Sequence, residues 1–163
     1  MEKKEANALL YLHGGPGERC FDFSYHQGEV LGRNLYTVML DQRGVCRSEA
    51  INESERFGLD DIIEDCESLR RCLGIRRWSV LGHSFGGFLA LLYGAKYPDS
   101  VHKLIFEAPT FDFRLTAIAL LKKTAELFGG QGRKDLQGEC LRLAKSGSET
   151  RELVEGIWVS AGS

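Results

Sequence analysis

The sequence predicts an α/β fold in which a mostly parallel sheet is flanked by helices. Short, continuously apolar runs suit strands that are buried on both faces, and helical patterns separate these runs. Strands that alternate with helices at this spacing form βαβ units with right-handed crossovers, so the sheet is expected to be parallel. Ligands bind such sheets at the carboxyl ends of the strands. Residues that follow the strands are therefore the first candidates for function.

The apolar runs predict four strands, at residues 8–12, 35–40, 78–81 and 101–107. Between the first two, Phe21 to Leu31 has no clear period, and we expect a loop with a short helix there. The strongest helical pattern covers Leu59 to Leu73, with acidic residues early, basic residues late and Gly74 at its end. Another helical pattern, at residues 88–97, follows the third strand directly.

The chain changes character after Asp112. Helical patterns at residues 113–128, 133–145 and 149–159 follow one another without a strand between them. Residues 129–134 are glycine-rich like a phosphate loop, but they follow a helix and lack the Gly-Lys-Ser/Thr ending, which favours a helix-ending turn. We therefore expect a sheet domain at residues 1–111 and a helical domain at residues 112–163.

Composition excludes several classes of function. The 163 residues are 43% hydrophobic and 27% charged, as in an ordinary globular protein, and a net charge of −2 favours neither nucleic acid nor an anionic membrane as partner. No apolar run reaches membrane-spanning length and no signal peptide opens the chain, so we expect a cytoplasmic protein. Five cysteines without a Cys-x-x-Cys pair indicate reduced thiols, with no metal site and no cofactor.

Chemistry-bearing turns follow the first three strands. In the third, a Gly-x-Ser-x-Gly pattern between a strand and a helix is typical of a nucleophile elbow. Such a serine occupies a strained turn, and Gly82 and Gly86 would let strand and helix pass close to it. The three turns are His13-Gly-Gly-Pro-Gly17, Asp41-Gln-Arg-Gly44 and Gly82-His-Ser-Phe-Gly-Gly87.

In this order and spacing the three turns resemble the α/β-hydrolase superfamily, and more narrowly the proline iminopeptidase (prolyl aminopeptidase) group. The resemblance covers about the first two-thirds of the chain. It implies a partial α/β-hydrolase core at residues 1–111 and the beginning of a helical cap at residues 112–163. It also implies that Ser84 is the nucleophile and that the backbone N–H groups of Phe85 and Gly15 form the oxyanion hole.

The same resemblance gives supporting roles to the residues around these positions. His13 and Gly14 belong to the oxyanion turn, and His83 would stabilise the elbow or line the pocket. Asp41 and Arg43 are expected to brace the active-site loops as an Asp–Arg pair. Asp41 precedes the serine, whereas these triads run Ser, then Asp or Glu, then His, so Asp41 is not expected to be the catalytic acid.

The general base is not evident in the sequence. His102 is the only histidine after Ser84, and it opens the fourth strand at the end away from the expected site. His26 comes too early in the family's order. For the acid, Asp112 follows the fourth strand, a position that some α/β-hydrolases use, although the commoner position lies one strand later.

Relative to the family the chain looks shortened at both ends. In the family's strand numbering, the four strands would lie in the order 4-3-5-6. Counted along this chain, that is the second, first, third and fourth strand, and the two outer strands would each have an unpaired edge. We expect a complementing chain or a homo-oligomer to cover these edges.

Three functions remain open. The leading one is a serine hydrolase that cleaves N-terminal residues, proline above all, from small peptides through an acyl-enzyme on Ser84. A second is an inactive hydrolase remnant or binding module. The third is an esterase or carbon–carbon-bond hydrolase of the same superfamily.

Overall fold

The computed structural model describes residues 7–15, 17–52, 54 and 56–145. They form two compact units that meet in the sequence between Phe111 and Asp112. The first unit comprises β1 (Ala8–Leu12), α2 (Phe21–Gly32), β2 (Tyr36–Leu40), α3 (Leu59–Cys72), β3 (Trp78–His83), α4 (Phe85–Lys96), the short 3-10 helix η1 (Pro98–Ser100) and β4 (Val101–Glu107). The second comprises α5 (Phe113–Gly130) and α6 (Lys134–Lys145).

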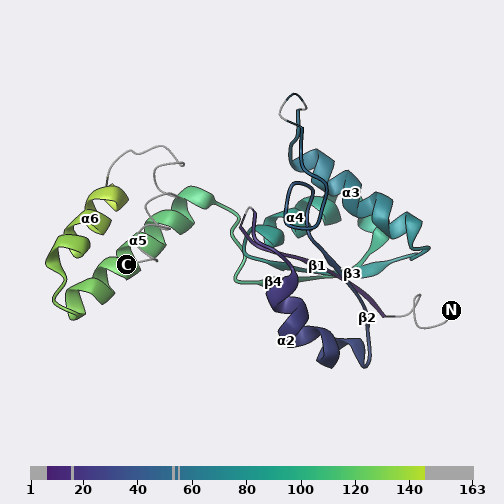
Figure 1. Cartoon of the computed structure of the whole chain (residues 1–163), viewed down its shortest axis with the longest axis horizontal. Helices are drawn as coiled ribbons and strands as arrows, with labels where there is room; N and C mark the ends of the chain where they lie inside the picture. The colour runs from purple at the N-terminus through teal and green to yellow at the C-terminus, as the bar shows by residue number, and fades with distance from the viewer. Residues whose placement is uncertain (1–6, 16, 53, 55, 146–163) are drawn as a thin grey trace. The chain divides into compact units, whose positions relative to one another are not determined.

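The sheet has the strand order β2-β1-β3-β4, and all three pairings are parallel. This confirms the predicted α/β class and the predicted strand order. β1 is buried along its whole length, whereas β4 is largely exposed. In the described part of the chain, no strand pairs with the outer side of β2 or of β4. Helix α2 lies on one face of the sheet and α3 and α4 lie on the other (Figure 1).

The structure corrects three element boundaries. Residues 21–32 form one continuous helix, α2, rather than a loop with a short helix. None of its residues is buried, so the helix has no apolar stripe from which its period could be read. Strand β3 continues to His83 instead of ending at residue 81. Helix α4 begins at Phe85 instead of Phe88, because two glycines in its first turn interrupt the apolar helical pattern in the sequence.

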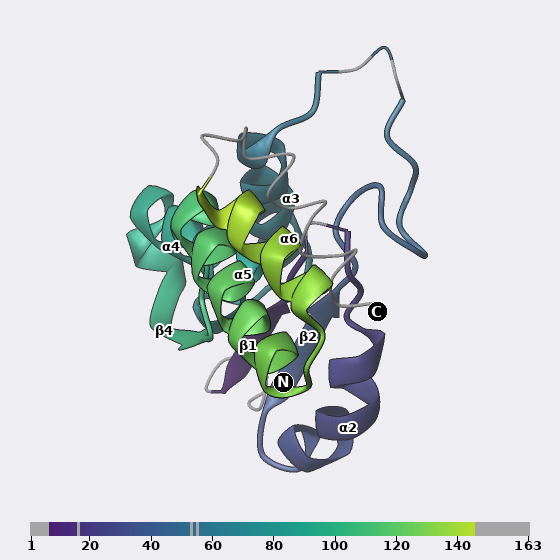
Figure 2. The same ribbon diagram turned by 90° about the vertical axis from the view of Figure 1, so that its left-hand side faces the viewer.

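The second unit is a pair of helices packed side by side (Figure 2). Its core consists of small and apolar side chains from both helices: Ala117, Leu121, Ala125, Phe128, Cys140 and Ala144. The glycine-rich segment at residues 129–134 ends α5, and within it the Arg133 N–H donates to the Phe128 carbonyl at 2.9 Å. The segment is therefore a helix-ending turn, as predicted. The third expected helix, residues 149–159, lies outside the described residues. That this unit is a cap stays a prediction. No described helix has the length and apolarity needed to cross a bilayer.

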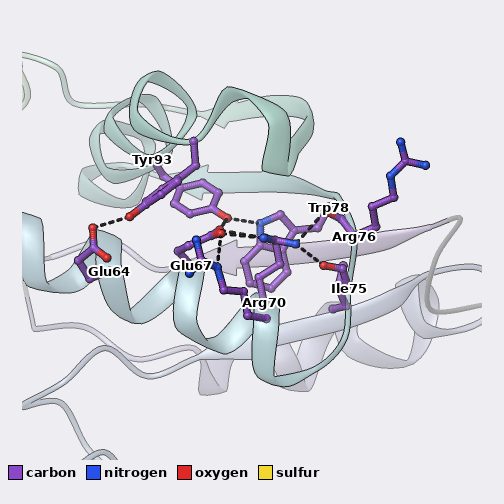
Figure 3. Close-up of polar contacts among 9 residues, drawn as sticks. Glu64, Glu67, Arg70, Ile75, Arg76, Trp78 and Tyr93 are labelled. Atoms are coloured by element: carbon purple, nitrogen blue, oxygen red, sulfur yellow. Dashed lines mark hydrogen bonds and ion pairs between the residues drawn. The ribbon is translucent and has the colours of Figure 1, made fainter.

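A buried carboxylate joins α3, α4 and β3 (Figure 3). Glu67 is only 3% exposed and accepts hydrogen bonds from the guanidinium groups of Arg70 (2.7 and 2.9 Å) and Arg71 (2.9 Å). It also accepts from the Tyr93 hydroxyl at 2.8 Å, and that hydroxyl in turn accepts from the Trp78 indole at 3.1 Å. Hydrogen bonds from Arg70, Tyr93 and Arg71 outweigh the effect of burial and lower the pKa of Glu67 to about 2.

We expect Glu67→Gln to lower the free energy of unfolding by about 3 kcal/mol, because the partly buried Arg70 guanidinium would lose its counter-charge. Urea denaturation followed by circular dichroism measures this loss. Glu64→Gln is the matched control, since Glu64 lies one turn earlier on α3 and its pairs with Tyr97 and Lys96 are solvent-exposed. Equal losses in the two variants would contradict a structural role for the buried network.

Acid should weaken the fold through the same carboxylate. The pKa of Glu67 falls from 4.5 to about 2 on folding, so the unfolded chain binds more protons between these values. The stabilisation is therefore complete above about pH 4.5 and disappears as the pH falls toward 2. The difference in unfolding free energy between wild type and Glu67→Gln should shrink across this window. A difference that stays constant from pH 6 to pH 2.5 would count against this assignment.

Candidate active site

Ser84 lies in the turn between β3 and α4 and has φ 50° and ψ −116°. A positive φ is uncommon for a residue with a Cβ and costs about 1–3 kcal/mol, so the surroundings must impose it. Three hydrogen bonds of 3.0 Å do so: the Ser84 N–H donates to the Glu107 carbonyl, and the Ser84 carbonyl accepts from the N–H groups of Gly87 and Thr110. The serine has the strained strand-to-helix geometry that the sequence pattern predicts.

The glycines around Ser84 allow the backbones to approach one another closely. A Cβ on Gly82 would overlap the carbonyl of Gly86, and a Cβ on Gly86 would overlap the carbonyl of Leu12 at the end of β1. This confirms the expectation that these two glycines let strand and helix pass close to the serine. The elbow is therefore wedged against the carboxyl end of β1, where the next functional turn begins.

Thr110 is a site residue that the sequence reasoning missed. Its hydroxyl lies 3.4 Å from the Ser84 hydroxyl, its N–H holds the Ser84 carbonyl, and it is buried. Its place in the sequence could have identified it: Thr110 follows the carboxyl end of β4, and β4 pairs with β3, whose carboxyl end carries the serine. Thr110 orients the serine hydroxyl but has no side-chain group able to act as a base at neutral pH.

The Gly14–Gly15 turn lies beside the serine. A Cβ built on Gly14 would stand 3.2 Å from the Cβ of Ser84. Gly15 has φ +110°, and a Cβ there would lie 2.6 Å from the Gly17 nitrogen, so neither position has room for a side chain. On the other side of Ser84, Phe85 is the first residue of α4, and N–H groups in the first turn point out of the helix. Both predicted oxyanion donors thus belong to backbone segments next to Ser84; Pro16 lies outside the described residues.

His13 is fully buried and holds the Gly14–Gly15 turn in place. Its Nε2 accepts from the Gln42 N–H at 3.2 Å, which leaves the proton on Nδ1 to donate to the Gly14 carbonyl at 2.9 Å. In a trans peptide the N–H points away from the carbonyl. By binding the Gly14 carbonyl, His13 therefore fixes the direction of the Gly15 N–H. Both ring nitrogens are occupied in this way, so the structure gives His13 a positioning role.

Asp41 and Arg43 have different partners from those expected. Asp41 accepts from the Cys20 N–H at 2.9 Å and from the Arg47 guanidinium at 3.1 Å. Arg43 instead donates to Asp65 on α3, with Nε at 3.0 Å. The expected Asp41–Arg43 pair is thus replaced by two pairs that tie the turn to the start of α2 and to α3.

The course of the loop explains this change of partner. Gly44 has φ +81° and Cys46 has φ 45°, and these two residues turn the chain back so that Arg47 reaches the Asp41 carboxylate. Burial disfavours the charged form of Asp41, but hydrogen bonds from Cys20 and Arg47 hold its pKa below the usual value. Asp41 is therefore ionised at neutral pH, with Arg47 as its counter-ion. That it braces the loops of a catalytic site stays a prediction.

In the described part of the first unit, none of the other candidate titratable groups is hydrogen-bonded to the Ser84 hydroxyl. His83 lines a hollow on the α2 side of the sheet together with His26, and its Nδ1 stands 3.3 Å from Glu107 Oε2 without forming a hydrogen bond to any described residue. His102 is at the amino end of β4, about 16 Å along the strand from its carboxyl end. Asp112 caps α5 by accepting from the Leu115 N–H at 2.8 Å.

Among the described residues, then, Thr110 is the side chain whose hydrogen bond reaches the Ser84 hydroxyl, and no histidine does so. Within the same residues no group of three or more His, Cys, Asp or Glu side chains is arranged to hold a metal ion. The arrangement places a strained serine between the Gly14–Gly15 turn and the first turn of α4, at the carboxyl edge of the sheet. Backbone N–H groups beside a serine are the chemistry by which acyl-transfer sites hold the oxygen of a carbonyl substrate.

Comparison with known proteins agrees with this geometry. Residues 7–148 match the family described as alpha/beta hydrolase fold. The chain belongs to the α/β-hydrolase family. Its structure is similar to that of a proline iminopeptidase-related protein from Thermus thermophilus, with a TM-score of 0.67 and 26% identity over 98% of this chain and 60% of that one. A marine microorganism esterase is also similar, with a TM-score of 0.55 and 25% identity over 71% of this α/β-hydrolase chain and 46% of the esterase.

Curated relatives of this α/β-hydrolase chain carry a more specific name. A putative proline iminopeptidase of Mycoplasma pneumoniae is 32% identical over 111 residues, which are 64% of this chain and 33% of that protein. A proline iminopeptidase of Xylella fastidiosa is 36% identical over 99 residues, which are 60% of this chain and 30% of that protein. The chain thus spans about a third of the length of these relatives.

We expect Gly86→Ala to lower the free energy of unfolding by about 1–3 kcal/mol, because the added Cβ overlaps the Leu12 carbonyl and no flexible side chain can move aside. Thermal unfolding measures the effect. Gly28→Ala on α2 is the control, since its Cβ would make ordinary contacts of 3.7 Å and the substitution should be neutral or stabilising. A tolerated Gly86→Ala would show that β1 and the elbow are not packed as described.

Proposed function

We propose that this α/β-hydrolase chain carries the nucleophile and the oxyanion-binding half of a serine hydrolase. The observation that supports this most directly is the strained Ser84, held at φ 50° beside the Gly14–Gly15 turn and at the start of α4. Strain of this kind persists only where the surroundings impose it, and functional sites are where it gathers. In nucleophile elbows a turn of this kind exposes the serine hydroxyl above the sheet.

In the proposed reaction the Ser84 oxygen attacks the substrate carbonyl carbon and gives its proton to a general base. The carbonyl oxygen becomes an oxyanion, which accepts hydrogen bonds from the Phe85 and Gly15 N–H groups. The tetrahedral intermediate then expels the amine or alcohol, which takes up the proton, and an acyl ester on Ser84 remains. Water then attacks the carbonyl carbon of this ester, which releases the acid and restores the Ser84 hydroxyl. The base and its acid partner would come from polypeptide beyond the described residues, in a longer parent chain or a second chain.

The proposed substrate is a small peptide from which the N-terminal residue, proline above all, is released. The relatives from Mycoplasma pneumoniae and Xylella fastidiosa, both named proline iminopeptidases, support this choice. Ester hydrolysis is the second candidate, and the similarity to the marine esterase favours it. We also propose a cytoplasmic location, which the five free thiols support.

The proposal is tested by acylation of the purified full chain. Incubation with p-nitrophenyl acetate should place an acetyl group on Ser84, detected by peptide mass spectrometry. The rate should be about 1,000 times that of the uncatalysed reaction in water, because an oxyanion hole and substrate binding retain this much catalysis without a complete triad. Ser84→Ala should abolish the label. Ser24→Ala removes an exposed serine on α2 and should leave acetylation unchanged.

The substrate preference is measured by incubating the same protein with proline p-nitroanilide or leucine p-nitroanilide. Release of p-nitroaniline that depends on Ser84 and prefers proline supports the aminopeptidase, whereas acetylation without release of either amine supports the esterase. A folded chain in which Ser84 is neither acetylated nor active on any of these compounds would overturn the proposal and favour an inactive binding module.

A further inference from the structure

The carboxylate of Glu18 lies beside the proposed nucleophile. Its Oε2 atom stands 2.7 Å from the point that a Cβ on Gly14 would occupy, and the Cβ of Ser84 stands 3.2 Å from the same point. The two atoms are therefore separated by no more than the sum of these distances, 5.9 Å. Glu18 is solvent-exposed, and an exposed carboxylate is charged at neutral pH. A negative charge thus lies next to the place where Ser84 would attack a carbonyl group.

Within the part of the chain that the structure describes, the carboxylate of Glu18 has no ion pair and no side-chain hydrogen bond. The three arginines of the surrounding loops each pair with a different carboxylate: Arg19 with Asp22, Arg43 with Asp65 and Arg47 with Asp41. Water solvates most exposed carboxylates. A substrate bound at Ser84 displaces water from the groups around it, and a carboxylate that loses water without gaining a counter-charge is destabilised.

The charge of Glu18 already acts on another group at this edge of the sheet. Burial above all, followed by negative charges that include those of Glu107 and Glu18, raises the pKa of Tyr11 to about 12. Tyr11 is on β1, one residue before the end of the strand. The carboxylate therefore influences charged forms of groups that lie at the carboxyl ends of the strands.

The surroundings of Ser84 thus combine groups of opposite electrostatic character. The start of α4 carries partial positive charge, which favours the oxygen that becomes negative during attack. Glu18 repels this oxygen and attracts a cation at a neighbouring atom. A substrate with a cation on the carbon next to its carbonyl group satisfies both, because the cation lies only two bonds from the carbon that Ser84 attacks.

We propose that Glu18 sets the charge preference of this site: it favours acylation of Ser84 by substrates that carry an ammonium group on the carbon next to the carbonyl, and it disfavours neutral acyl groups. The inference rests on the proposed serine hydrolase function, but not on whether the bond that is cleaved is an amide or an ester. Glu18 takes no part in proton transfer. It acts only through its charge.

The test uses two phenyl esters that have the same shape and a different charge. The phenyl ester of betaine carries a trimethylammonium group where phenyl 3,3-dimethylbutanoate carries a tert-butyl group. Phenol release by the full chain is measured at pH 7, release by Ser84→Ala is subtracted, and peptide mass spectrometry verifies the acyl group on Ser84. Dividing the cationic-to-neutral rate ratio of a variant by that of the wild type cancels the intrinsic reactivities of the two esters.

Glu18→Gln should lower this ratio about tenfold, the order of effect expected for a unit charge about 6 Å away at a partly solvated site. Its rate with the neutral ester should rise, which loss of a merely structural residue would not cause. Glu18→Asp keeps the charge and should keep a preference for the cationic ester. Salt at about 0.5 M should weaken the wild-type preference by screening and leave Glu18→Gln unaffected.

Glu29→Gln is the matched control. It also removes one exposed carboxylate, but from the part of α2 that leads to the amino end of β2, away from Ser84. The ratio should stay at the wild-type value.

The outcomes separate this inference from the function on which it rests. If Ser84 is acylated in the wild type and in Glu18→Gln with the same ratio, Glu18 does not select charge and only this inference falls. If Glu18→Gln loses activity on both esters equally, its role is structural and the inference falls as well. If neither ester acylates Ser84 in a wild-type chain that circular dichroism shows to be folded, the proposed hydrolase function falls and takes this inference with it.

Discussion

The first unit depends on one close approach, where the start of α4 meets the end of β1. Gly86 packs so tightly against the Leu12 carbonyl that no Cβ fits between them. This contact requires the chain to turn sharply after β3, and Ser84 takes a positive φ as a result. It also brings the turn after β1 alongside the serine. The strained residue and the turn that faces it are therefore two consequences of the same packing constraint.

Strain at Ser84 has to be offset elsewhere, and the Glu67 cluster lies where it can do so. The cluster ties α3 and α4 to the start of β3, at the end of that strand opposite the serine. Because it anchors both elements that flank the elbow, the turn has little freedom to relax. Asp41 and His13 do the same for the two neighbouring turns. Buried charges in this unit thus support the site without touching the reacting atoms.

The parts of the fold that were predicted from sequence are those whose signal is local. Strands buried on both faces give unbroken apolar runs, and the elbow needs its glycines at fixed spacing. The full extent of helix α2 was not predicted because none of its residues is buried, so burial leaves no clear period in its sequence. Arg47 was missed as the partner of Asp41 because the loop reverses at Cys46, a residue type that does not signal a positive φ. Thr110 reaches the serine only through the pairing of β3 with β4.

A base for Ser84 is the chemical requirement that this packing does not meet. Among the described residues, Thr110 reaches the serine hydroxyl at 3.4 Å but cannot act as a base at neutral pH, and hydrogen bonds occupy both ring nitrogens of His13. His102 lies at the amino end of β4, whereas the serine lies at the carboxyl end of β3. The strain at Ser84 and the glycine contacts around it are set by the packing of the first unit itself. A base that approached the carboxyl edge of the sheet would therefore meet a serine already held in its turn, so the base could be supplied by a separate part of the polypeptide without rebuilding the elbow.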